Sequence, residues 1–121
     1  MISGSVSDRH ALVPVTFRFP DRPDLTIEFV VDTGFTDYLC LPPEAVAVLG
    51  LPYEYDQPAN LADNSEVLLP VHGAVIVGNG QERTIGLLAT GRRPLLGTAL
   101  LDGQELVVQF QQGGLVTIDD L

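Results

Sequence analysis

The 121-residue sequence contains no lysine and no tryptophan, and it has one cysteine and one methionine. Its six basic side chains are all arginines and stand against sixteen acidic residues, so the formal net charge is -10 at pH 7. A nucleic-acid-binding protein needs a basic surface for the phosphate backbone, and docking on anionic lipid needs a polybasic segment. The charge balance therefore argues strongly against both kinds of partner.

The single cysteine, Cys40, has no second cysteine with which to form an intrachain disulfide. This excludes a small secreted scaffold held together by disulfides, and we expect Cys40 to be a small buried hydrophobic residue. No apolar run approaches the roughly 18 residues of a membrane-spanning helix. The N-terminal segment 1–5 lacks the basic and apolar regions of a signal peptide. We therefore expect a soluble, cytoplasmic protein that does not contact a membrane.

The length of the chain and its apolar content predict one globular domain. A chain of 121 residues and 13.0 kDa has the size of a single ordinary domain. Apolar residues make up 45% and charged residues 18%, which is typical of a folded protein and not of a disordered one. We find no linker, no low-complexity tract and no repeat of fixed period, so we expect residues 1–121 to form a single domain.

The apolar pattern at the start of the chain is that of β-strands. Residues 12–19 alternate between apolar and other side chains, which predicts a half-buried strand. Pro14 places this strand at the edge of a sheet or makes it an irregular first strand, because proline cannot donate a ladder hydrogen bond. Turn residues at 20–24 separate it from a second strand at 25–31, so the two strands predict a hairpin.

The rest of the chain predicts more strands and little helix. Residues 43–50 predict a two-turn helix, because Pro43 suits its first turn and Gly50 its end. Residues 95–101 predict a short strand followed by one helical turn, and 78–80 (Gly-Asn-Gly) a hairpin turn. The remaining strands are expected at 38–41, 66–77, 82–89, 105–110 and 115–118. The fold class that follows is all-β, with one or two short helices.

The most informative residues are Asp32, Thr33 and Gly34, which come directly after the apolar strand at 25–31. A carboxylate at the end of a buried strand is costly unless it is hydrogen-bonded. Thr33 can hydrogen-bond locally, and Gly34 permits a tight turn whose backbone N–H groups face the carboxylate. Such a turn holds an acid in a defined, partly desolvated position. Taken alone, the tripeptide is more often a simple turn at the end of a strand.

The segments that follow change this interpretation. A polar turn at 61–65 is flanked by β segments, and residues 95–97 (Leu-Leu-Gly) end 65 positions after Asp32 and precede a helical turn. The order of apolar strand, Asp-Thr-Gly-Phe, short helix, polar hairpin and apolar-apolar-glycine resembles the retropepsin-like (clan AA) aspartic proteases. The resemblance is to small bacterial and archaeal members with a DTGF motif, and it covers roughly residues 10–118.

This resemblance implies an acid-protease β-barrel and a role for each matching residue. Asp32 would be the catalytic acid, Thr33 would grip its counterpart across a dimer axis, and Gly34 would support the active-site turn. Leu96 and Gly97 would lie in a strand that crosses behind that turn. A flap hairpin over the substrate would carry the substrate-binding residues Ala62, Asp63, Asn64 and Ser65. No cofactor and no metal is implied.

The resemblance also implies two chains, because the sequence has a single Asp-Thr-Gly. Aspartic peptidases use two carboxylates that share one proton, since like charges about 3 Å apart do not both ionise readily. One carboxylate acts as base on a water molecule, and the other, protonated, polarises the peptide carbonyl. A working site would therefore be a homodimer with Asp32 of each chain at the two-fold axis. Terminal strands near 2–8 and 115–120 would help to join the chains, and the substrate would be an extended peptide.

Two departures from the retroviral pattern keep another interpretation open. Phe35 stands where retroviral members carry a small residue that can hydrogen-bond the catalytic pair, and the turn at 61–65 contains no glycine. A non-catalytic peptide- or protein-binding domain of the same fold is therefore the alternative. A module of a larger assembly is a third possibility with no specific support. We expect no metal site, because His10 and His72, the two histidines, lie in no metal-binding motif.

Overall fold

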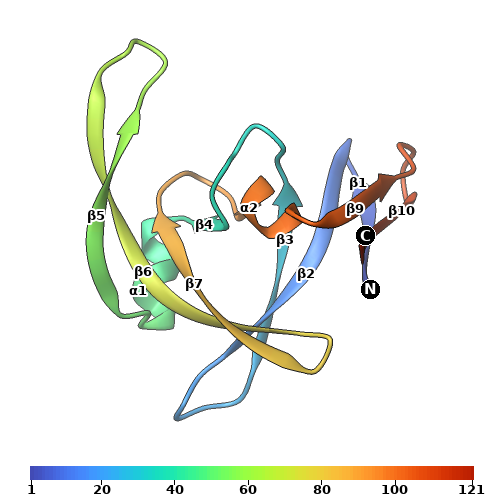
Figure 1. Ribbon diagram of the computed structural model, residues 1–121, viewed down its shortest axis with the longest axis horizontal. Coiled ribbons are helices and arrows are strands. Elements are labelled where there is room, and N and C mark those ends of the chain that lie inside the picture. Colours follow the sequence, from blue (N-terminus) through green and yellow to red (C-terminus); the bar gives the residue numbers. More distant parts are fainter.

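The computed structural model describes residues 1–121 and shows ten strands and two short helices (Figure 1). In chain order these are β1 (Ile2–Ser7), β2 (His10–Arg18), β3 (Leu25–Val31), β4 (Leu39–Leu41), α1 (Pro43–Leu49), β5 (Tyr53–Asn60), β6 (Glu66–Gly78), β7 (Gln81–Ala89), β8 (Leu95–Leu96), α2 (Thr98–Leu101), β9 (Gln104–Val108) and β10 (Leu115–Asp120). Neither helix is long and apolar enough to span a membrane. The predicted mostly-β architecture with short helices is confirmed.

All ten strands belong to one sheet, in the order β5-β6-β7-β4-β8-β3-β2-β1-β10-β9. One further pairing joins β6 to β2, with Thr16–Arg18 opposite Val75–Val77. The hydrogen-bonded order therefore leads from β2 through β6, β7, β4, β8 and β3 back to β2. Most neighbours are antiparallel, but β8 runs parallel to β3, and β4 runs parallel to β7. The first of these parallel contacts lies at the end of β3, where Val30 and Val31 pair with Leu95 and Leu96.

Local sequence explains the hairpins and the helix. The strands β6 and β7 are joined by Asn79 and Gly80, whose φ angles of 50° and 75° are those that a tight two-residue hairpin turn requires. The helix α1 starts at Pro43 and ends at Gly50, which is left-handed and donates its N–H back into the last turn. The hairpin of β2 and β3 and the strand-then-helix at 95–101 are also present, as predicted.

The position of β2 in the sheet differs from the expectation based on Pro14. This strand is not at an edge, because β3 lies on one side of it and both β1 and β6 lie on the other. The strand β1 pairs with residues 10–12 and β6 pairs with residues 16–18. Pro14 falls between these two partners, where no strand pairs with it on that side. A residue without an N–H donor is tolerated there, although the strand is interior.

The two terminal strands are used within the chain. The strand β1 lies between β2 and β10, and β10 lies between β1 and β9, so the N- and C-termini are neighbours (Figure 1). The resemblance implies that strands near 2–8 and 115–120 help to join two chains. Within the single chain both terminal strands have strand partners, and β5 and β9 stand at the two ends of the sheet order. An unpaired strand edge is the natural place for another chain to add.

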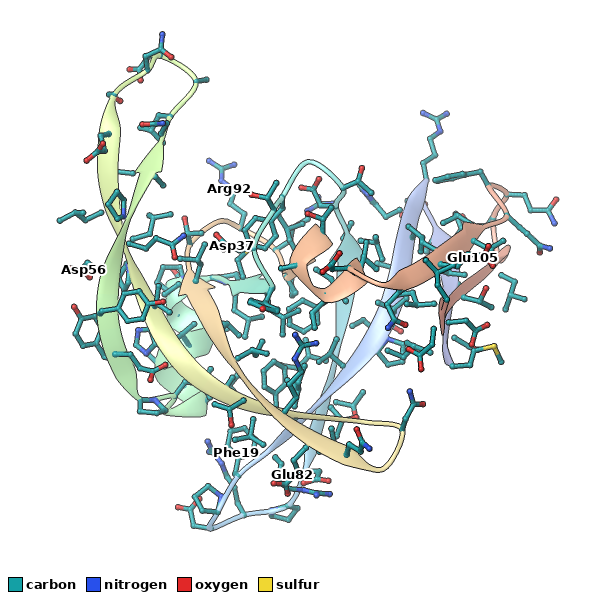
Figure 2. All side chains as sticks on the ribbon, in the orientation of Figure 1. Phe19, Asp37, Asp56, Glu82, Arg92 and Glu105 are labelled. Carbon is teal, nitrogen blue, oxygen red and sulfur yellow. The ribbon has the colours of Figure 1, made fainter.

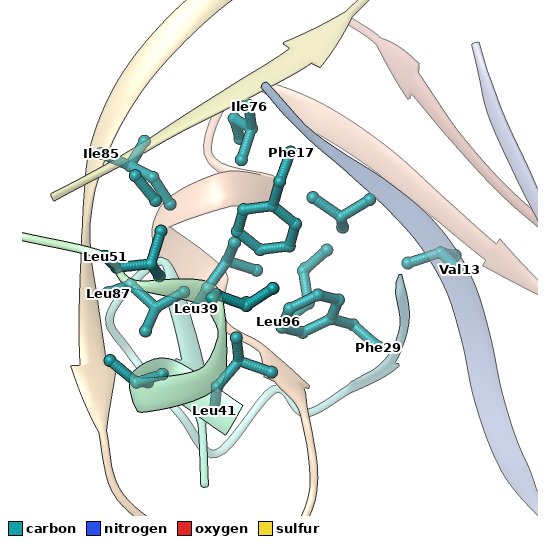
Figure 3. Close-up of a cluster of buried hydrophobic side chains, with 14 of the residues drawn as sticks. Val13, Phe17, Phe29, Leu39, Leu41, Leu51, Ile76, Ile85, Leu87 and Leu96 are labelled. Atoms are coloured by element: carbon teal, nitrogen blue, oxygen red, sulfur yellow. The ribbon is translucent and has the colours of Figure 1, made fainter. Parts of the chain in front are cut away.

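The core lies inside the curved sheet and is entirely apolar (Figure 3). Phe17 of β2 and Phe29 of β3 are both fully buried, and their ring centroids are 6.0 Å apart. Val46 and Leu49 of α1 close one side of the same cluster. No polar or charged residue is buried. Alternation along β2 therefore identifies the inward face correctly, with Phe17 at its centre.

Replacing Phe17 by alanine tests this core. Phe17→Ala leaves a cavity at a fully buried position, so we expect the free energy of unfolding to fall by about 3–5 kcal/mol. Phe110→Ala is the matched control, because this ring is 72% exposed, and we expect a change within about 0.5 kcal/mol. Urea denaturation measures both values. Equal losses in the two variants would show that Phe17 is not a core residue.

Candidate active site

Asp32 lies at the end of β3, in a turn that is fixed by hydrogen bonds to β8 and to the two residues after Thr33. Its backbone N–H donates to the carbonyl of Leu96 at 2.9 Å, which continues the parallel pairing of β3 with β8. Its Oδ1 accepts a hydrogen bond from the backbone N–H of Gly34 at 2.9 Å, and the N–H of Phe35 donates to its carbonyl at 3.1 Å. The carboxylate is half-buried, and its Oδ2 makes no hydrogen bond within the chain. One oxygen is thus held by the turn, and the other is available.

The loop after Asp32 wraps closely over Gly97. The N–H of Gly97 donates to the carbonyl of Tyr38 at 2.9 Å, and the N–H of Thr98 donates to the carbonyl of Phe35 at 2.8 Å. A Cβ atom on Gly97 would lie 2.1 Å from the carbonyl oxygen of Asp37 and 2.6 Å from that of Phe35. Only glycine fits this position. The loop after Asp32 is therefore packed directly on the start of α2.

The structure brings five of the predicted site residues together. They are Asp32, Thr33, Gly34, Leu96 and Gly97. Thr33 and Gly34 are exposed on the turn, whereas Leu96 and Gly97 are buried behind it. Thr33 makes no side-chain hydrogen bond within the chain, so its hydroxyl is free for another partner.

The four predicted flap residues lie elsewhere, at the tip of the hairpin formed by β5 and β6, which projects from the body (Figure 1). We call residues 53–70 the flap hairpin. Its tip, Leu61 to Ser65, takes the left-handed conformation at Asn64, with φ of 66°, where a glycine is absent. All four predicted residues are exposed, and none hydrogen-bonds to the Asp32 turn.

Asp63 organises the tip of the flap hairpin. Its Oδ1 accepts hydrogen bonds from the backbone N–H of Ser65 at 2.9 Å and from the hydroxyl of Ser65 at 2.5 Å. These bonds, the hydroxyl first, hold the pKa of Asp63 below its ordinary value of 3.8. The resemblance suggests that Asn64 and Ser65 contact substrate directly. The structure shows that the Ser65 hydroxyl is already used by Asp63.

The contact between the flap hairpin and the loop after Asp32 lies halfway along the hairpin. Here Nε2 of Gln57 donates to Oδ2 of Asp37 at 2.9 Å, and Asp37 lies between the hairpin and the turn after β3 (Figure 2). Sequence motifs do not identify either residue, because a glutamine and an aspartate 20 positions apart have no sequence signature. No strand is predicted at 53–60 from the sequence, so the face on which Gln57 lies follows only from the observed pairing of β5 with β6.

An apolar cluster fills the same junction. Its buried members are Cys40, Val71 and Leu88, and the half-buried side chains packed against them are Phe35, Leu69 and Leu95. The bulky Phe35 thus joins the loop to the base of the flap hairpin. Its ring is part of a packed cluster, which accounts for a large side chain after Asp-Thr-Gly.

Cys40 is 2% exposed, which confirms the prediction of a small buried hydrophobic residue. Burial raises the pKa of its thiol, the backbone of Leu95 lowers it by a hydrogen bond, and the charge of Asp32 raises it again. The thiol is therefore protonated at neutral pH and is not a nucleophile. No three His, Cys, Asp or Glu side chains lie close enough together to hold a metal ion.

One of the comparisons with known proteins shows a fold like that of this chain. The structure is similar to the crystal structure of a retropepsin-like aspartic protease from Rickettsia conorii, with a TM-score of 0.58. The two chains are 20% identical, and the match covers 98% of this chain and 90% of that chain. No protein-family model matches the sequence, and no curated protein matches it. A likeness at this level of identity shows a common fold and leaves the activity to be argued from the site.

Gly97→Ala tests the close approach of the loop after Asp32 to Gly97. The added Cβ must displace the carbonyls of Asp37 and Phe35, so we expect a loss of about 2 kcal/mol or more in the free energy of unfolding. Gly78→Ala is the matched control, because no atom lies within 4 Å of its Cβ position, and we expect a change within about 0.5 kcal/mol. Urea denaturation compares them. A Gly97→Ala protein as stable as the control would contradict the packing described here.

The pKa of Asp63 tests the organisation of the flap tip. We expect NMR titration of the carboxyl carbon to give a value below 3.8, and Ser65→Ala to move it back toward that value. Because the folded-state pKa is the lower one, the stabilisation is present above pH 3.8 and is lost as the pH falls through the folded-state value. An unchanged titration in Ser65→Ala would show that the hydroxyl does not hold the tip.

Proposed function

We propose that residues 1–121 form one retropepsin-like domain and that the protein is an aspartic endopeptidase acting as a homodimer. The observation that carries this proposal is the Asp32 turn. One carboxylate oxygen is held by the N–H of Gly34, the other is unengaged, and the residues around it are exposed. A half-buried acid presented in this way, with a single copy in each chain, suits a dyad completed by a second chain.

The reaction follows from two such carboxylates sharing one proton. The ionised Asp32 takes a proton from a water molecule, whose oxygen bonds to the peptide carbonyl carbon, while the protonated Asp32 of the second chain hydrogen-bonds the carbonyl oxygen. The tetrahedral intermediate then loses the amine, which leaves with a proton from the dyad as the C–N bond breaks. In each chain the N–H of Gly34 orients one oxygen of Asp32. Thr33, with its free hydroxyl, would contact the equivalent turn of the second chain.

The substrate we propose is an extended peptide laid as a strand between the flap hairpin and the Asp32 turn. Val67 and Leu69 are half-buried side chains of the hairpin, and Leu69 packs on the same cluster as Phe35. Such walls suit apolar side chains on either side of the cut. The return pairing of β6 with β2 supports a closed acid-protease barrel beneath this cleft.

A peptide-binding domain that does not cleave remains the second candidate. Phe35 favours it, because this side chain cannot hydrogen-bond a catalytic pair as a small hydroxyl residue can. The packing of Phe35 into the cluster around Cys40 leaves the carboxylate of Asp32 uncovered, which favours the enzyme. We also propose a cytoplasmic location, for which the support is the single free thiol of Cys40.

Asp32→Asn tests the catalytic role. We expect cleavage of a mixed peptide library between pH 3 and 7 to fall by about a thousandfold or more, because the dyad loses its proton-sharing acid. Asp102→Asn is the matched control, since this exposed aspartate lies outside the Asp32 turn and is not part of an Asp-Thr-Gly sequence, and its activity should be unchanged. Cleavage by wild type should peak below neutrality, where the shared proton is present. Cleavage by Asp32→Asn at a rate close to that of wild type would remove Asp32 from the mechanism.

The same variant tests the requirement for two chains. Adding excess Asp32→Asn protein to a fixed amount of wild type should lower cleavage as hybrid dimers form, and Asp102→Asn protein should not. Sedimentation equilibrium measures the dimer directly. Cleavage by a protein that is monomeric at the assay concentration would contradict the shared dyad. Peptide binding without cleavage, in wild type and variant alike, would favour the binding domain.

A further inference from the structure

We propose that Gln57 is a positioning residue of this site, whose hydrogen bond to Asp37 holds the flap hairpin against the Asp32 turn. The role of Gln57 in catalysis rests on the proposed function. The contact between the hairpin and the loop, however, can be measured without substrate. Four features of the junction carry it: the face of β5, the anchoring of Asp37, the surrounding cluster and the lack of any other polar tie.

Gln57 is on the inner face of the flap hairpin. It pairs with Leu69 across the hairpin and is half-buried, whereas its neighbours Asp56 and Pro58 are exposed. Asp56 lies on the outer side of β5 (Figure 2). Because side chains alternate along a strand, Gln57 points toward the body of the protein. Its Nε2 is 2.9 Å from Oδ2 of Asp37.

Asp37 is anchored on the other side of the junction. Its carbonyl accepts a hydrogen bond from the N–H of Ala99 at 3.3 Å, and Gly97 packs directly beneath it. It is also five residues from Asp32, on the same loop. The Gln57 amide therefore ties the hairpin to the part of the loop that is fixed by β8 and α2, and through it to the position of the catalytic acid.

No other side-chain hydrogen bond or ion pair joins residues 53–70 to the rest of the chain. At the base of the hairpin Tyr53 packs edge-on against His72 of β6. The contact between the hairpin and the loop after Asp32 is otherwise apolar, with Leu69 and Phe35 both packed on the cluster around Cys40. A hydrogen bond to a charged, half-buried carboxylate is stronger than one between neutral groups, and breaking it leaves that charge without its donor. The Gln57–Asp37 pair is thus the polar latch of an otherwise apolar junction.

A swap of the two side chains tests the latch. Gln57→Glu places two carboxylates face to face and breaks it. Asp37→Asn keeps an acceptor for the Gln57 amide and should preserve it. The double variant Gln57→Glu/Asp37→Asn reverses donor and acceptor, because the new asparagine amide can donate to the new glutamate. Rescue by the swap separates this hydrogen bond from any general effect of either substitution.

Cys40 reports the opening of the junction, because it is the single cysteine and lies beneath the hairpin contact. We expect an aromatic disulfide reagent to label Cys40 about tenfold faster in Gln57→Glu than in wild type, and at close to the wild-type rate in Asp37→Asn and in the swap. The faster labelling should depend weakly on urea, as local opening does, and not with the full slope of global unfolding.

Three results would overturn the proposal: wild-type labelling in Gln57→Glu, no rescue by the swap, or acceleration with the full urea slope of global unfolding. In the cleavage assay kcat/KM should follow the same swap pattern. If the enzyme is active and the double variant rescues the labelling rate, but kcat/KM is the same in all variants, the hydrogen bond is a structural contact without a positioning role. Loss of the expected labelling pattern in an enzyme that needs Asp32 would reject the latch alone. The expected pattern in a protein that never cleaves would reject the proposed function alone.

Discussion

The candidate site depends on the parallel docking of β8 beside the end of β3. The hydrogen bond from the N–H of Asp32 to the carbonyl of Leu96 joins two segments that are 64 residues apart, and it places Gly97 directly under the loop that follows the acid. Because Gly97 has no side chain, the carbonyls of Asp37 and Phe35 can lie where the Cβ atom of any other residue would be. The acid, its turn and the loop are therefore positioned as one unit.

The same unit sets the place of the flap hairpin. Asp37 presents its carboxylate to Gln57, and Phe35 extends the apolar cluster that Leu69 enters from the hairpin. The loop after Asp32 thus has two functions in this architecture. On one side it packs on Gly97, which fixes the position of Asp32. On the other side it contacts the flap hairpin. The loop therefore contacts both sides of the proposed cleft.

The acidic side chains of this protein lie at or near the surface, and several of them accept hydrogen bonds from nearby donors. No charged residue is buried, and the half-buried Asp32 and Asp37 are each held by an uncharged donor, an N–H in one case and an amide in the other. Arg18 binds Asp24 and Glu82 on the outside, which lowers the pKa of Asp24. A dimer would carry twice the charge of -10, and mild acid would reduce that repulsion while supplying a shared proton.

Local chemistry by itself determined several elements of this fold. Alternation in residues 12–19, Asn79-Gly80 in a turn, and Pro43 and Gly50 around a helix each act over a few residues, so the sequence alone identifies these elements and the Asp32 turn. Tertiary structure decided which strands and side chains are neighbours. Pro14 is interior because two different strands share one side of β2, and the terminal strands pair within the chain. Gln57 meets Asp37 because pairing across the sheet brings them together. Such contacts depend on the pairing of distant strands, which no local pattern encodes.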